Sequence, residues 1–165
     1  MNGNAKVLEH LQTALSMELG AMQQYMLHAH VVEDWGFDGL ASKMREEMQE
    51  ELGHAQEYTR RIMFLGGEPV VTATKPPARA QTVKDMLEGD LKDELDAIKY
   101  YTEAAQTADK ASDIGSRDLF ERIVLDEEGH RGWLQKQLKL LARLGEPAYL
   151  QMQIGTASAG AMSAE

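Results

Sequence analysis

The chain has 165 residues, the size of a single domain that can bury a core without disulfides or a structural metal. It contains no cysteine, which excludes disulfide frameworks, zinc ribbons, iron–sulfur clusters and cysteine-ligated iron, so oxygen and imidazole must hold any bound metal. Its net charge of −10 repels nucleic acids and attracts cations. No signal peptide or membrane-spanning run is apparent, so we expect a cytoplasmic protein whose partners are metal ions or protein chains.

Apolar residues recur at helical spacing along almost the whole chain, which predicts an all-α fold. We expect a first helix over residues 4–34, a short turn at 35–37 and a second helix over 38–65 that the glycines at 66 and 67 end. Together these two helices predict an antiparallel hairpin. The side chains expected to point inward from it are Leu11, Leu15, Met22, Tyr25, Met26, Leu40, Met44, Met48, Tyr58 and Ile62.

The segment 66–81 contains three prolines and is too long for an ordinary loop, so we expect it to cross the length of the bundle in extended form. A third helix is predicted from about residue 82, and a turn at 112–115 leads to a fourth over 116–144. Their expected inward residues include Met86, Leu87, Leu91, Ile98 and Tyr101. A short fifth helix is predicted over 147–154.

Four long helices with one long crossover are typical of the ferritin-like four-helix bundle. We therefore predict one ferritin-like domain over residues 1–155 and a mobile tail over 156–165.

A constant offset of 76 residues relates the two predicted hairpins, which indicates two pseudo-equivalent halves. It takes Glu18 to Glu94, Tyr25 to Tyr101, Glu51 to Glu127, Gly53 to Gly129 and His54 to His130.

The repeated residues include a Glu-x-x-His motif in each half, and residues i and i+3 of a helix share one face. In each hairpin, the lone glutamate and the motif are equally far from the turn, so they face one another. We therefore predict a buried cluster whose ligands are Glu18, Glu51, His54, Glu94, Glu127 and His130. Two divalent cations would neutralise its four carboxylates, in the di-iron or di-manganese carboxylate pattern. The ligand types suit iron, manganese or zinc.

Other polar residues receive simpler interpretations. Tyr25 is the candidate hydrogen-bonding or redox neighbour of the metals, while the other aromatic residues are interpreted as packing. Gly53 and Gly129 are expected to let a neighbouring helix or side chain approach closely. We expect His10, His28 and His30 at the surface, and Glu46, Glu47 and Glu50 on a solvated acidic face.

The sequence resembles bacterioferritin over nearly its whole length, most specifically in segments 24–29, 61–65 and 126–134. The resemblance implies a hollow cage of 24 subunits, each with a ferroxidase centre formed by the six predicted ligands. It implies two Fe ions per chain, oxidation of Fe(II) by oxygen or peroxide, and storage of a ferric mineral.

One position departs from the bacterioferritin pattern. The resemblance implies that a methionine directly after Glu51 ligates a haem between paired subunits, but Leu52 stands there and cannot ligate iron. Met48 lies one turn earlier, and its use would displace the porphyrin. We therefore expect either a haem-free cage or co-assembly with a subunit that supplies the methionine.

Two alternative functions share parts of this pattern. A rubrerythrin-like peroxidase also has two Glu-x-x-His motifs, but the chain lacks cysteine for the usual electron-transfer iron, and the short fifth helix favours a cage. The chain could also serve as a shell subunit of a mixed cage, although the complete ligand set argues against that role.

Overall fold

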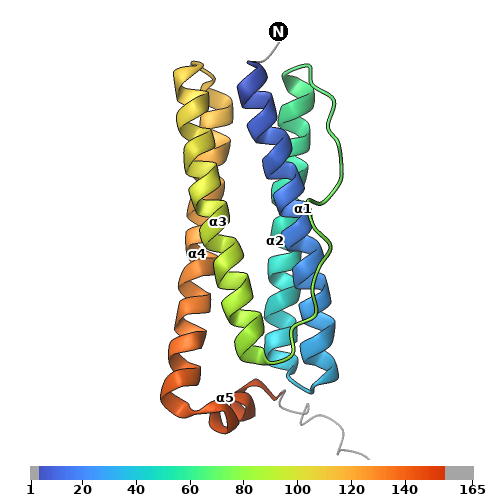
Figure 1. Cartoon of the computed structure of the whole chain (residues 1–165), viewed down its shortest axis with the longest axis vertical. Helices are drawn as coiled ribbons and strands as arrows, with labels where there is room; N and C mark the ends of the chain where they lie inside the picture. Colours follow the sequence, from blue (N-terminus) through green and yellow to red (C-terminus); the bar gives the residue numbers. More distant parts are fainter. Residues whose placement is uncertain (1–3, 155–165) are drawn as a thin grey trace, which may run out of the picture.

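The computed structural model describes residues 4–154, which fold into helices without any strand. The helices are α1 (Ala5–Asp34), α2 (Asp38–Phe64), α3 (Val83–Lys110), α4 (Ile114–Leu144) and α5 (Glu146–Gln153). α1 and α2 form one hairpin, α3 and α4 form the other, and α5 lies at one end of the bundle (Figure 1). This confirms the predicted four-helix bundle with a short fifth helix. The predicted tail, 156–165, lies outside the described residues.

Polar side chains define where three of the four long helices begin, α2 being the exception. The Asn4 side chain accepts the N–H of Lys6 at 3.0 Å, and Thr82 caps α3 by accepting the N–H of Asp85. Asp113 accepts the N–H of Ser116 in the same way, so α4 begins at Ile114. The helix thus begins two residues before the position of about 116 that the sequence predicts, because the capping aspartate lies inside the predicted turn.

The crossover between α2 and α3 runs in extended form beside α1, along the length of the bundle (Figure 1). Two glutamines of α1 hold its backbone. Gln12 accepts the N–H of Val70 and donates to its carbonyl, both at 2.8 Å. Gln24 does the same to Ala78, at 2.9 and 2.8 Å. Because each amide satisfies both polar groups of one residue, the crossover is fixed at two points.

The core consists of two apolar clusters at different heights in the bundle. One includes Leu15, Tyr58 and Phe120, and the other includes Tyr25, Met44, Leu87, Leu134 and Tyr149. Nearly all residues predicted to point inward are buried or partly buried, but Met26 is 44% exposed. Its neighbour Tyr25 takes the buried position, and Met26 is rotated about 100° around the helix away from it.

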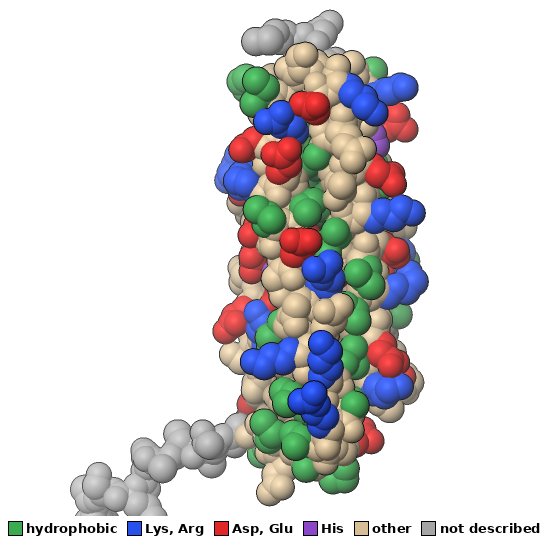
Figure 2. All heavy atoms as spheres, turned by 90° about the vertical axis from the view of Figure 1, so that its left-hand side faces the viewer, with side chains coloured by type: hydrophobic (Ala, Val, Ile, Leu, Met, Phe, Trp, Pro, Cys, Tyr) green, Lys and Arg blue, Asp and Glu red, His purple; other side chains and the backbone are tan. Residues whose placement is uncertain are grey.

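No described helix is long and apolar enough to cross a membrane. On the side where α3 and α4 lie, acidic and basic side chains are interspersed with hydrophobic ones along the whole length of the bundle (Figure 2).

Candidate metal centre

The six predicted ligands converge between the two apolar clusters, and all four long helices contribute to the site. α1 supplies Glu18, α2 supplies Glu51 and His54, α3 supplies Glu94, and α4 supplies Glu127 and His130. Each is at most 6% exposed, which is rare for glutamate without a partner of opposite charge.

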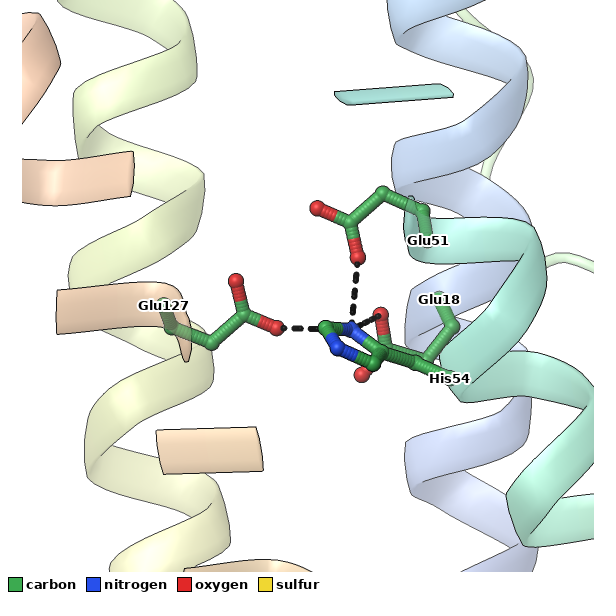
Figure 3. Close-up of side chains that lie close together, drawn as sticks. All are labelled: Glu18, Glu51, His54 and Glu127. Atoms are coloured by element: carbon green, nitrogen blue, oxygen red, sulfur yellow. Dashed lines mark hydrogen bonds and ion pairs between the residues drawn. The ribbon is translucent and has the colours of Figure 1, made fainter. Parts of the chain in front are cut away.

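A first group of donor atoms surrounds His54, whose ring points from α2 toward α4 (Figure 3). Its Nδ1 lies 3.3 Å from Oε2 of Glu51, 3.5 Å from Oε1 of Glu127 and 3.7 Å from Oε2 of Glu18. One donor atom from each of these four residues lies within 4.8 Å of the others. The group could therefore hold one metal ion.

A second group surrounds His130 and uses the opposite oxygens of the same two carboxylates. Its Nδ1 lies 2.9 Å from Oε2 of Glu127, 3.3 Å from Oε1 of Glu51 and 3.7 Å from Oε1 of Glu94. Glu51 and Glu127 belong to both groups, so each carboxylate could contribute to both cation sites. The two subsites follow the internal repeat, because Glu18 and His54 correspond to Glu94 and His130.

The electrostatics of the cluster favour cations. Burial, and then the charge of Glu51, raises the pKa of Glu18 to about 8, and burial raises the pKa of Glu94 well above its usual range. Burial opposes the imidazolium form of His54 and His130, but their carboxylate neighbours outweigh it and raise the pKa of both rings. The raised pKa values mean that these groups take up protons to balance the buried negative charge. Two divalent ions could replace those protons, so the residues fit a pair of divalent ions.

Tyr25 lies directly beside this cluster. Its hydroxyl donates a hydrogen bond to Oε1 of Glu94, and burial, followed by the charge of Glu94, raises its pKa well above the usual value. The repeat places Tyr101 in the other half, where burial and then the charge of Glu18 raise its pKa. Each outer glutamate is thus close to a buried tyrosine.

A cavity of about 240 Å³ leads from the cluster toward the crossover. Glu18, Glu51, Glu94 and Glu127 line its inner part. Its wall also includes Asp90, Asp93 and Asp96 of α3 and Thr74 and Lys75 of the crossover. The exposed Lys75 ammonium lies 3.0 Å from Asp93. Acidic residues thus extend from the surface to the cluster.

The prediction that His28 lies at the surface was wrong. His28 is 3% exposed, Gln24 lies 2.7 Å from its Nε2, and Asp90 lies 3.1 Å from its Nδ1. His30 is exposed as predicted, whereas His10 is partly buried and lies 3.0 Å from the hydroxyl of Tyr100. Helical spacing could have identified His28, because it lies three residues after the inward-facing Tyr25.

Two further interpretations were wrong. Glu47 is only 2% exposed and lies 2.7 Å from Nε2 of His130, whereas Glu46 and Glu50 are exposed as predicted. Its spacing of four residues before Glu51 was the available signal. A Cβ at Gly53 or Gly129 would meet nothing within 4 Å among the described residues, so close approach of a neighbour does not explain either glycine.

Comparisons with known proteins agree with this architecture. A family model of the ferritin-like domain matches residues 8–144. A bacterioferritin of Brucella melitensis biotype 1 is 45% identical over 157 residues, which cover 95% of this chain and 98% of that protein. A bacterioferritin of Rhodobacter capsulatus is 42% identical over 149 residues, covering 90% and 92% of the two chains.

The solved structure of Rhodobacter capsulatus bacterioferritin, which has a metal-free dinuclear site and haem iron in a crystallographic special position, is also similar. It matches with a TM-score of 0.92 and 40% identity, over 96% of this chain and 99% of that chain. The similarity in sequence and structure extends well beyond the shared fold, and the chain therefore belongs to the ferritin-like family and, within it, to the bacterioferritins.

Proposed function

We propose that the buried cluster is the ferroxidase centre of this chain, which, as a bacterioferritin, is an iron-storage ferroxidase. The observation that supports this assignment is the pair of overlapping four-residue groups, in which Glu51 and Glu127 are shared. Such sharing is suited to two ions held close together, which is the arrangement that a two-electron reaction with an oxidant needs.

The substrate is Fe(II), and two ions give up one electron each. With two protons, these electrons reduce one O₂ to H₂O₂, or one H₂O₂ to two waters. The chain supplies placement and charge balance: the carboxylates hold the substrate ions, and the apolar clusters on either side limit access of water.

The cavity is the proposed route by which Fe(II) reaches the centre. Asp93 and Asp96 attract cations near its outer part, and Asp90 continues the acidic wall inward. The ion pair between Lys75 and Asp93 is exposed, so solvent screens it and it opposes cation passage only weakly.

The proposed assembly is a homo-oligomeric cage, with 24 subunits as its expected size and the cytoplasm as its setting. Light scattering of the purified protein separates such a cage from a small oligomer of the rubrerythrin type. Iron retained per cage after aerobic loading separates storage from peroxidase turnover, since only storage accumulates mineral.

An aerobic Fe(II) titration of metal-free protein tests the proposed centre. Ferric absorbance should rise in a fast phase that saturates at about two iron ions per chain, one for each four-residue group. A native protein with no fast phase would not be a ferroxidase. The chain would then be a shell subunit, or its carboxylates would hold some other metal.

Leu52 predicts that this chain alone does not ligate haem. Its aliphatic side chain offers no lone pair, and Met48 packs against the apolar cluster that contains Met44. Haem added to native protein should give no Soret band of stoichiometric intensity, whereas a Leu52→Met variant should acquire one. Met48→Leu is the control and should behave like the native protein. A full Soret band in native protein would contradict the haem-free assignment, and loss of that band in Met48→Leu would identify Met48 as the ligand.

Removing the Tyr25 hydroxyl is expected to slow iron oxidation about tenfold while leaving two ions bound per chain, because Glu94 loses the donor that orients it. Stopped-flow absorbance of a Tyr25→Phe variant measures this effect. Tyr100→Phe is a matched control, since Tyr100 contacts His10 away from the centre. Equal rates in native and Tyr25→Phe protein would remove Tyr25 from the reaction.

A further inference from the structure

The two histidines of the centre differ in what their outer nitrogen contacts. Nε2 of His54 lies 3.2 Å from Oδ2 of Asp126. Nε2 of His130 lies 3.4 Å from Oε2 of Glu50, which is the repeat equivalent of Asp126. His130 has an additional and closer neighbour, Oε2 of Glu47 at 2.7 Å. The outer contacts therefore follow the repeat except for Glu47.

The environment of Glu47 has no counterpart in the other half. Glu47 pairs with Lys43 one turn earlier, and the Lys43 ammonium lies 5.6 Å from the centre of the Trp133 ring. The repeat places Leu119 and Ile123 at the positions equivalent to Lys43 and Glu47, and both are part of the apolar core. A buried, charge-balanced carboxylate thus supports only one of the two histidines.

The two contacts also differ in their exposure to solvent. Asp126 is 45% exposed, so water competes for its carboxylate and salt screens its charge, whereas Glu47 is shielded from both. His54 and Asp126 form a hydrogen bond, whereas His130 and Glu47 are in ion-pair contact at 2.7 Å without one.

A metal-bound histidine commonly donates its second ring N–H to a carboxylate, which fixes the tautomer and aims the other nitrogen at the metal. We propose that Glu47, held by Lys43, is a positioning residue for His130 and makes the Glu94–His130 subsite bind divalent cations more tightly than the Glu18–His54 subsite. The inference rests on the proposed function only in requiring that the six ligands bind cations.

Glu47, Glu50 and His130 also lie close enough together to hold a cation themselves. The Lys43 ammonium argues against that use, because it already neutralises Glu47 and would repel a second cation beside it. Glu47 therefore acts through the imidazole.

Calorimetric titration of the metal-free, assembled protein with Co(II) tests the proposal, with the visible absorption of bound Co(II) as a second readout. Native protein should bind two ions per chain with unequal affinity. In Glu47→Gln protein the tighter event should weaken about 10–100-fold, with an altered Co(II) spectrum, while the weaker event stays unchanged. Asp126→Asn is the matched variant for His54 and should weaken Co(II) binding at the Glu18–His54 subsite by a smaller factor.

A double-mutant cycle assigns the effect to His130. In a His54→Ala background, Glu47→Gln should weaken the remaining Co(II)-binding event by the same factor. In a His130→Ala background, Glu47→Gln should leave the Co(II) affinity unchanged. Equal effects in both backgrounds would identify a general structural role and overturn the proposal, as would unchanged affinity in Glu47→Gln protein. Loss of a third Co(II) equivalent would instead show that Glu47 is a ligand. Native protein that binds no Co(II) at these residues would contradict the proposed metal centre itself.

Discussion

Replacing Glu127 with alanine is expected to abolish the fast phase of Fe(II) oxidation, with a rate loss of at least about 100-fold. Changing a group that only supports a metal ligand costs about 10–100-fold, and Glu127 belongs to both four-residue groups, so its loss affects both subsites at once. Stopped-flow ferric absorbance after aerobic mixing of metal-free protein with two Fe(II) per chain measures the effect.

Two variants make this result specific. Glu128→Ala removes the neighbouring, 43% exposed glutamate, which pairs with Arg131 at the surface, and should leave the fast phase intact. Glu18→Ala removes a ligand of one subsite only, so calorimetry should still detect one Co(II) per chain, whereas Glu127→Ala should weaken both events. A Glu127→Ala protein that oxidises Fe(II) as fast as the native chain would place the ferroxidase reaction elsewhere.

The ligand set could be predicted because it depends on regularities that a sequence carries. The spacing of Glu51 and His54 places both on one helix face, and the repeat supplies the same arrangement again with Glu127 and His130. In each hairpin the lone glutamate and the motif are equally far from the turn, so all four glutamates are expected to meet inside the bundle. The structure brings all six residues together as expected, and their role as metal ligands stays a prediction until a titration tests it.

The contacts of the residues around the ligands, such as Glu47 and His28, could not be predicted in the same way, because their partners lie on other helices. Helical spacing places Glu47 on the same face as Glu51, but only the position of His130 on α4 shows which group its carboxylate contacts. His28 is similar, since spacing indicates that it faces inward but not that its partner is Asp90 of α3. A buried polar residue needs a partner, and the sequence does not say which distant residue will provide it.

The contact between Glu47 and His130 also explains why a symmetric ligand set need not give equal subsites. The repeat constrains the residues that touch the ions, but each hairpin packs its outer side against different neighbours. At the position where α2 has Glu47, α4 has Ile123 in the apolar core. Differences between the subsites are therefore expected to arise from packing around the ligands.

The metal-free protein is expected to lose stability as the pH rises from about 5 to 8. Folding raises the pKa of Glu18 from 4.5 to about 8, which stabilises the folded state fully below pH 4.5. This stabilisation, on the order of a few kcal/mol, is lost as the pH rises to about 8. The raised pKa values of His54 and His130 act in the same direction above pH 6.5. Thermal melting of chelator-treated protein across this range measures the slope.

Cations should reverse that slope, which ties the pH dependence to the centre. With saturating Co(II), the ions replace the protons, and because deprotonated ligands bind them more strongly, stability should increase with pH. Glu18→Gln should flatten the metal-free slope, whereas Glu128→Gln, at the exposed neighbour of Glu127, should leave it unchanged. Carboxylates with a lowered pKa, such as Asp113 beside Ser116 and Arg61, act in the opposite sense only at lower pH. A metal-free protein that instead gains stability toward pH 8 would mean that the four glutamates are not buried together without their ions.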